Sequence, residues 1–221
     1  MKRMKQPDTL VSPLLVYLVT IFVATLVISN VLSNHMIEFF GISLDAGTLT
    51  FPITYIISDV LSEVYGYKWT RRSAWVAAAM NAVFAIFIHL SCALPQPEWY
   101  AGLVFETALK GSTRIVIASI VSFVLGDWAN DFVFEYMKQI QKSKKGFSLR
   151  AILSSLAGSI VDTTAFVFIA FLGAMPASEM CPMILTSIII KTGYEVIALP
   201  LTVFVTKKVQ ASEDAYMRVK V

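Results

Sequence analysis

Acidic residues recur inside stretches of this sequence that are otherwise strongly apolar. Within these stretches the Asp, Glu and Lys residues are Asp59, Glu63, Asp127, Asp131, Glu135, Asp162, Lys191 and Glu195. Several of them are spaced four residues apart, which places them on one face of a helix. Carboxylates so placed can accept hydrogen bonds from a ligand, take up protons or hold a cation. The elements that position them must therefore bring several such faces together.

The composition indicates an integral membrane protein. Hydrophobic residues make up 57% of the 221 positions and charged residues 15%, whereas ordinary soluble domains have about 25% charged residues. A soluble protein of this size could not bury so much apolar surface.

Six apolar stretches are long enough to cross a bilayer core of about 30 Å as helices. They lie near residues 14–33, 49–65, 73–94, 115–137, 151–175 and 183–206. Their length and lack of alternation favour helices over strands. The prediction is a single transmembrane domain over residues 1–221, an all-α bundle of six membrane-spanning helices.

The distribution of basic residues predicts the orientation of this bundle. Fifteen of the 18 Lys and Arg residues fall in the two tails and in the two connections near residues 66–72 and 138–150. The opposite side carries Lys110 and Arg114, in a connection that reads either as an interfacial amphipathic helix or as an ordered loop. By the positive-inside rule both termini are expected in the cytoplasm.

The acidic residues within the spans are expected to face a shared interior. A charge at the centre of a membrane helix costs roughly 2.5–3.5 kcal/mol, and such residues commonly mark pathways and sites. This interpretation is favoured for Asp59, Asp127 and Asp162. Glu63 and Glu135 could instead pair with cytoplasmic Lys or Arg, and Lys191 and Glu195 could be an ion pair that only joins helices. An excess of acids over bases implies protonation or a cationic partner, so protons, sodium or a cationic or amide-rich substrate all fit.

Aromatic residues near these acids could stack on a planar ligand. Tyr55 shares a face with Asp59, Trp128 adjoins Asp127, and Tyr194 adjoins Glu195. Packing against protein or lipid is the more common role for each of them. A disulfide between Cys92 and Cys181 is geometrically allowed. Transport is favoured over catalysis because no nucleotide-binding, hydrolase or zinc motif is present, and neither a metal nor a cofactor is expected.

A longer motif carries a resemblance to a known family. The stretch TFPITYIISDVLSEVYGYKWTRR, residues 50–72, resembles the signature of the queuosine precursor transporters, also called vitamin uptake transporters. Further agreement lies in Ser29-Asn30, in Arg114-Ile115, in GSIVDTTAFVFIAFLG at residues 158–173 and in KTGYEVIALP at residues 191–200.

The resemblance implies six membrane helices in the bacterial inner membrane and uptake of a 7-deazaguanine base for tRNA modification. The substrate would be 7-cyano-7-deazaguanine, 7-aminomethyl-7-deazaguanine or queuine. Substrate-binding or coupling residues carried over by motif are Asn30, Asp59, Glu63, Arg114, Asp127, Asp162, Lys191 and Glu195, and Tyr55, Trp128, Asp131 and Tyr194 complete the predicted set.

A carboxylate can accept hydrogen bonds from the N1–H and 2-amino groups of such a base. The hypothesis is that Asp59 or Glu63 makes this contact. Other expected partners are membrane lipid, a coupling proton or sodium ion, and a second copy in a homodimer; nucleic acid is not expected.

Two alternatives stay open from the sequence. The chain could be the substrate-binding subunit of an energy-coupling-factor vitamin transporter, although its first span lacks an obvious repeated Ala spacing. It could also be a membrane scaffold or assembly factor, against which the number of mid-membrane acids argues.

Overall fold

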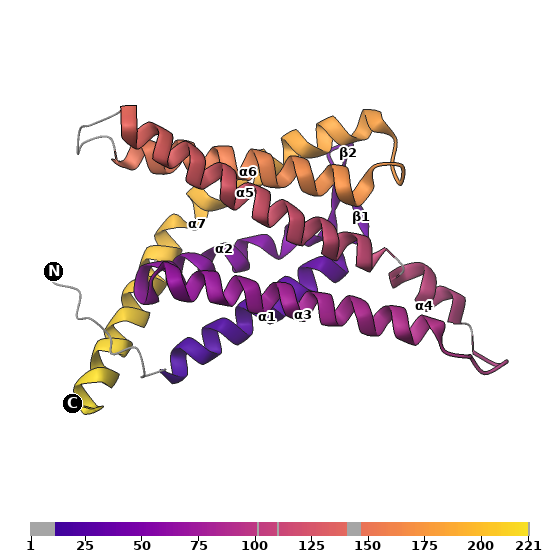
Figure 1. The fold of residues 1–221 in the computed structure, drawn as a ribbon, viewed down its shortest axis with the longest axis horizontal. Helices are drawn as coiled ribbons and strands as arrows, with labels where there is room; N and C mark the ends of the chain where they lie inside the picture. The colour runs from indigo at the N-terminus through magenta and orange to yellow at the C-terminus, as the bar shows by residue number, and fades with distance from the viewer. Residues whose placement is uncertain (1–11, 101, 110, 141–146, 221) are drawn as a thin grey trace.

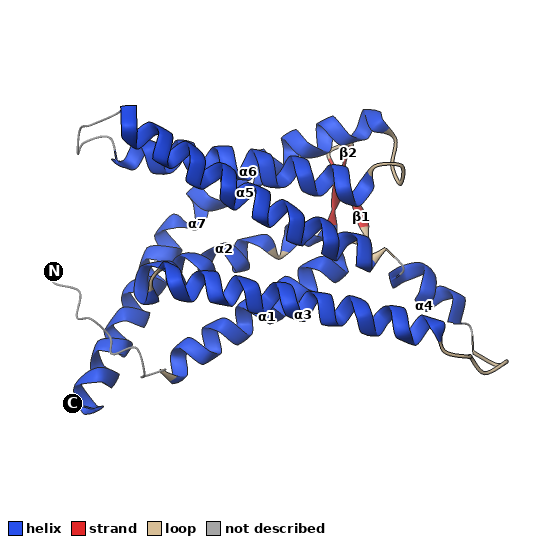
Figure 2. Ribbon diagram, in the orientation of Figure 1, coloured by secondary structure: helices blue, strands red, loops and turns tan. Residues whose placement is uncertain are grey.

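The computed structural model describes residues 12–100, 102–109, 111–140 and 147–220. These residues form helices and one small hairpin of two antiparallel strands (Figures 1 and 2). In chain order the elements are α1 (Pro13–Leu32), β1 (Met36–Phe39), β2 (Ile42–Asp45), the 3₁₀ helix η1 (Ala46–Leu49), α2 (Phe51–Val60), the π-helical turn η2 (Leu61–Tyr65), α3 (Tyr67–Ala93), α4 (Gly102–Leu109), α5 (Ser112–Ile140), α6 (Phe147–Phe171) and α7 (Ala177–Lys220).

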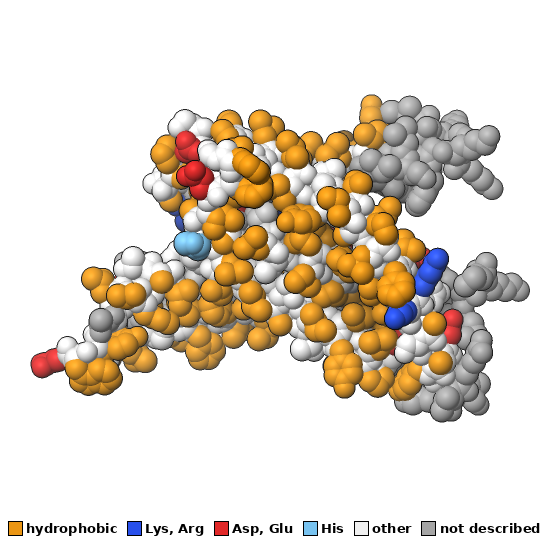
Figure 3. Space-filling model, turned by 180° about the vertical axis from the view of Figure 1, so that it is seen from behind, with side chains coloured by type: hydrophobic (Ala, Val, Ile, Leu, Met, Phe, Trp, Pro, Cys, Tyr) orange, Lys and Arg blue, Asp and Glu red, His pale blue; other side chains and the backbone are white. Residues whose placement is uncertain are grey.

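Five helical stretches of the described chain are long and apolar enough to cross a membrane. They are Pro13–Leu32, Tyr67–Ala93, Gly102–Asn130, Leu153–Phe171 and Ala177–Tyr216. The predicted class, an all-α bundle of membrane-spanning helices, is confirmed. Figure 3 agrees, since apolar side chains cover the middle of the face shown and charged ones lie toward its ends.

The predicted second span is present as a shorter and less regular element. Helix α2 covers Phe51–Val60, and the π-helical turn η2 continues it to Tyr65. At about 1.5 Å per residue, this length falls short of a bilayer core of about 30 Å. Gly66 ends the helix because its φ of 86° is a conformation that other residues rarely adopt. Because this span is short, the hairpin of β1 and β2 can lie beyond the N-terminal end of α2.

The hairpin between α1 and α2 was not predicted from the sequence. Strands β1 and β2 pair in the register Met36↔Asp45 to Phe39↔Ile42. Phe40 and Gly41 connect the strands with φ values of 51° and 77°. Positive φ at both central residues is typical of a type I′ turn, whose twist matches that of the paired strands.

Two apolar clusters divide the bundle into two groups of helices. Leu15, Phe22, Ile57, Leu61 and Ala77 join α1, α2, η2 and α3. Leu44, Ile115, Ala118, Val167, Ala170, Phe171, Met180 and Met183 join the hairpin to α5, α6 and the start of α7. The site described below lies between these two clusters.

Helix α7 connects the two groups, since it contacts both α6 and α2. It runs beside α6 and then turns away toward the C-terminus, near the start of α1 (Figure 1). Pro182 and Pro200 lie inside this helix, and a proline there removes a backbone hydrogen bond and favours a kink. Near its end, the Tyr65 hydroxyl donates a hydrogen bond to Oε1 of Glu213 over 2.9 Å.

Candidate functional site

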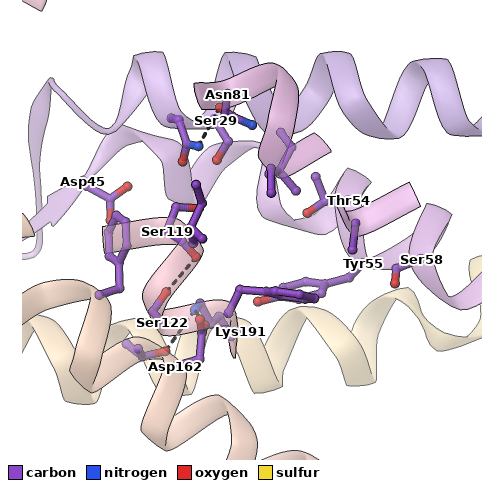
Figure 4. Close-up of a pocket in the computed structure, with 18 of the residues that line it drawn as sticks. Ser29, Asp45, Thr54, Tyr55, Ser58, Asn81, Ser119, Ser122, Asp162 and Lys191 are labelled. Atoms are coloured by element: carbon purple, nitrogen blue, oxygen red, sulfur yellow. Dashed lines mark hydrogen bonds and ion pairs between the residues drawn. The ribbon is translucent and has the colours of Figure 1, made fainter. Parts of the chain in front are cut away.

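A cavity of about 200 Å³ lies between the two groups of helices. Every long helix and the end of β2 contribute to its lining, so it is a property of the whole bundle. The polar lining residues are Ser29, Asn30, Asp45, Thr54, Tyr55, Ser58, Asn81, Ser119, Ser122, Asp162, Thr163, Ser187 and Lys191. Figure 4 shows Asn81 and Ser29 on one wall, Lys191 and Asp162 on the opposite wall, and Asp45 at one end.

Lys191 and Asp162 form an ion pair on the wall built by α6 and α7. The Lys191 ammonium lies 2.9 Å from Oδ2 of Asp162 and donates a second hydrogen bond to the Thr163 hydroxyl, also over 2.9 Å. Lys191 is 7% exposed, whereas the Asp162 side chain keeps 30% of its surface accessible. The pair therefore presents a cationic donor and an anionic acceptor side by side.

An amide pair forms the opposite wall, between α1 and α3. The Asn30 amide donates to Oδ1 of Asn81 over 2.7 Å, and the Asn81 amide donates to the Ala77 carbonyl over 2.9 Å. Both side chains are buried, Asn81 almost completely. Buried amides are retained where their hydrogen bonds are satisfied, and this chain of bonds fixes Asn30 beside the cavity.

Asp45 lies at the end of β2 and is 3% exposed. The Ser33 hydroxyl of the α1 cap donates to its Oδ1 over 2.7 Å. The next turn is held against α1 as well, since the Ser29 hydroxyl donates to the Gly47 carbonyl. Burial raises the pKa of the Asp45 carboxyl above its ordinary value, although the Ser33 hydrogen bond and the Lys191 charge act in the opposite direction.

Aromatic rings complete the lining. Phe22, Tyr55, Phe123 and Phe166 each border the cavity. In Figure 4 the Tyr55 ring extends from α2 toward Lys191. Rings so placed offer flat apolar faces beside the polar groups, an arrangement that suits a planar ligand with a polar edge.

Four of the predicted site residues line this cavity: Asn30, Tyr55, Asp162 and Lys191. Asp59 and Tyr194 instead border a much smaller hollow on another side of α2, together with Tyr55. The predicted face of α2 therefore borders two separate spaces. Tyr55 borders both the cavity and the smaller hollow, whereas Asp59 borders only the hollow.

The other predicted residues lie elsewhere. Glu63 is exposed in η2, and Trp128 is 73% exposed on α5 beside the half-buried Asp127. The Arg114 guanidinium donates to the carbonyls of Ile169 and Leu172, where it satisfies backbone groups at the C-terminal end of α6. The side chains of Asp131 and Glu195 lie outside the described residues.

Several lining residues were not predicted from the sequence, and most of them are uncharged. Asn81, the seven serines and threonines and Asp45 were not selected. Small polar residues on apolar helices were the available signal, since Asn81, Ser119, Ser122 and Ser187 each interrupt an apolar run. Cys92 and Cys181 are free thiols, so the allowed disulfide is not formed.

Comparison with known proteins gives a consistent result. Residues 45–205 match the model of a family described as "Putative vitamin uptake transporter". The chain is 24% identical over 176 residues to the "Probable queuosine precursor transporter" of Bacillus subtilis, a match that covers 79% of this chain and 76% of the relative.

Two further relatives carry similar names. Identity is 26% over 143 residues with the "Queuosine precursor transporter" of Escherichia coli, covering 65% of this chain and 62% of the relative. Identity is also 26%, over 126 residues, with the "Probable queuosine precursor transporter" of Haemophilus influenzae. This match covers 57% of this chain and 51% of the relative. The chain thus spans less than two thirds of these two relatives. No solved structure gives a significant match.

Proposed function

Because the chain belongs to the vitamin uptake transporter family, whose model matches residues 45–205, we propose that it carries 7-deazaguanine precursors of queuosine across the bacterial inner membrane into the cytoplasm. The chain is a multi-pass membrane protein, and its relatives are named as transporters rather than enzymes. The names of these relatives do not favour the energy-coupling-factor alternative.

The observation that carries the proposal is the chemistry of the cavity. A guanine-like edge presents an acceptor, O6, beside two donors, N1–H and the 2-amino group. Lys191 and Asp162 present the complementary order, a cationic donor next to a carboxylate, 2.9 Å apart. In the proposed complex Lys191 donates to O6 and Asp162 accepts from the two N–H groups.

The size and walls of the cavity support the same ligand class. At about 200 Å³, the cavity is smaller than the roughly 300–1,000 Å³ that accommodates drug-sized ligands, which suits one bicyclic base. Tyr55 and Phe166 offer faces on which the ring can stack. The cavity draws on both groups of helices, as expected where a substrate is bound between moving halves of a transporter.

The test is rescue of queuosine in tRNA. A strain that lacks its own synthesis and transporter is given this protein and each precursor in turn. The wild-type chain should restore queuosine in tRNA with at least one precursor. The Asp162→Asn variant should not restore queuosine when that precursor is supplied at low concentration. A normally expressed wild-type protein that rescues with none of the precursors contradicts the proposal.

Variants of Asp59 and Glu63, the residues first predicted to contact the base edge, are compared with Asp162→Asn in the same strain. Asp59→Asn and Glu63→Gln change acids that lie outside the cavity lining. Contact of Asp59 or Glu63 with the base edge remains a prediction. Full uptake by both variants at normal expression would eliminate it and favour Asp162 in that role.

A further inference from the structure

The cavity contains one acid that the proposed contacts with the base edge do not use. Among the described lining residues, Asp45 and Asp162 are the carboxylates and Lys191 is the one cationic side chain. Lys191 bonds directly to Asp162. When all three groups are ionised, their charges sum to one negative charge, and Asp45 is the surplus acid.

The surroundings of Asp45 make this surplus charge unfavourable in the absence of a cation. The side chain is 3% exposed, and a buried carboxylate needs a counter-charge or several hydrogen bonds to stay ionised. The Ser33 hydroxyl supplies one such bond and the backbone amides of Gly47 and of Asp45 itself supply others, but burial has the larger effect. Burial raises the pKa of Asp45 above its ordinary value, so a positive group that reaches the carboxylate removes part of the cost of its ionisation.

Of the two acids on the strands of the hairpin, Asp45 is the one that lines the cavity. Glu38 is the other acid on the two strands, and it is exposed. The turn after Asp45 cannot shift easily, since a Cβ on Gly47 would lie 2.8 Å from the Ser29 carbonyl oxygen and 2.3 Å from the Ser33 hydroxyl. Asp45 is therefore fixed at one end of the cavity, away from the wall that holds Lys191 and Asp162 (Figure 4).

We propose that Asp45 is a specificity-determining residue that binds a protonated amine on the substrate and so selects a cationic 7-deazaguanine over a neutral one. This inference rests on the proposed function and refines it. The amine of 7-aminomethyl-7-deazaguanine donates to the Asp45 carboxylate, while the base edge lies against Lys191 and Asp162. The nitrile of 7-cyano-7-deazaguanine has no proton to donate and gains nothing from Asp45.

Proton exchange follows from this contact. Any proton that Asp45 holds passes to water as the ammonium group binds, so the bound pair is a carboxylate and a cation. The ionisable groups on elements around Asp45 are Tyr55 on α2, Asp162 on α6, Lys191 and Glu179 on α7, and His35 and Glu38 at the hairpin. Substitution of Asp45 alone distinguishes its contribution from theirs.

The experiment measures binding of both bases to the purified full-length protein in lipid nanodiscs by titration calorimetry. Asp45→Asn keeps the shape of the side chain and an acceptor for Ser33. The variant should bind the aminomethyl base about tenfold or more weakly, because hydrogen bonds between charged groups are among the stronger ones. Its affinity for the nitrile base should change little, which also shows that it is folded. Glu38→Gln, on the same hairpin, should bind both bases like the wild type.

A pH series supplies a second readout. Because burial raises the pKa of Asp45 above its ordinary value, wild-type affinity for the aminomethyl base should rise with pH above that ordinary value, as Asp45 loses its proton. Asp45→Asn should lack this rise.

Three outcomes overturn the inference. Equal weakening of both bases by Asp45→Asn would assign Asp45 to the base edge, and no weakening of either would remove it from the site. An unchanged pH dependence in the variant would assign the titration to another group. If the wild type binds neither base, the proposed function itself fails, which separates the two conclusions.

Discussion

At the scale of single residues, the cavity combines one ion pair with a set of uncharged polar groups. Lys191 is buried at 7% exposure and bonds to both Asp162 and Thr163. A buried charge that loses its partner is destabilising, because its desolvation is no longer offset. The integrity of the pair should therefore affect folding as well as binding.

Replacement of Lys191 by Met should lower both thermal stability and binding. The change leaves the Asp162 carboxylate without its counter-charge, at a cost below the ~3–5 kcal/mol of a fully buried pair, because Asp162 is partly accessible. Thermal unfolding in detergent measures the effect, and Asp162→Asn added to Lys191→Met should restore part of the stability.

Lys207→Met is the matched control, since this lysine is exposed on the same helix. It should unfold at the wild-type temperature. Equal stability of Lys191→Met and wild type would show that the ion pair contributes nothing to the fold.

At the scale of elements, α5 and α6 make the most extensive contact among the described helices, and two glycines allow their close approach. A Cβ on Gly126 would lie 2.7 Å from the Cβ of Asp162, and one on Gly158 would lie 2.9 Å from the Gly126 carbonyl oxygen. Small residues at such contacts let membrane helices approach closely. This contact sets the position of Asp162 on the cavity wall.

Gly126→Ala should therefore weaken substrate binding as well as stability. The added methyl must push α6 and Asp162 aside, and overpacking of this kind costs roughly 1–3 kcal/mol. Thermal unfolding and uptake of precursor measure the two effects. Gly193→Ala on α7 is the control, because its Cβ would meet nothing within 4 Å. If Gly126→Ala unfolds and transports like Gly193→Ala, the close contact has no such role.

The helices were predictable from the sequence, whereas the lining of the cavity was only partly so. Long apolar runs predict spans because a bilayer imposes their length. A position inside an apolar span also indicates that Asp162 and Lys191 face a shared interior. It does not give the rotation of a helix, so Asp59 and Trp128 could not be distinguished from residues that face the cavity. Asp45 was missed because its position depends on a hairpin of four-residue strands, too short to stand out between two spans.

At the scale of the whole molecule, the hairpin connects the two groups of helices. It bonds to α1 through Ser33 and to α7 through Ser43, whose hydroxyl lies 3.4 Å from Oε2 of Glu179. Leu44 packs with residues of α5, α6 and α7. We expect one of these attachments to yield during transport, because alternating access moves parts of a bundle relative to one another around the site.

Crosslinking of the hairpin to α7 should stop transport reversibly. Cysteines at positions 43 and 179, in a chain whose Cys92 and Cys181 are changed to serine, can be joined by a short reducible bis-thiol reagent. Uptake of precursor into cells should fall to background after crosslinking and return after reduction. The single variant Ser43→Cys, treated alike, should transport throughout. Full uptake by a completely crosslinked protein would show that this contact persists during transport.

The bond between Tyr65 and Glu213 has a consequence for biosynthesis. It joins positions 148 residues apart, and contacts of such long sequence separation form late in folding because much chain must first be ordered. Nearly all of the described chain must leave the ribosome before this end of the bundle can close. Until then α1, α2 and α3 lie in the membrane without this contact to α7, so the incomplete bundle leaves this surface uncovered during synthesis.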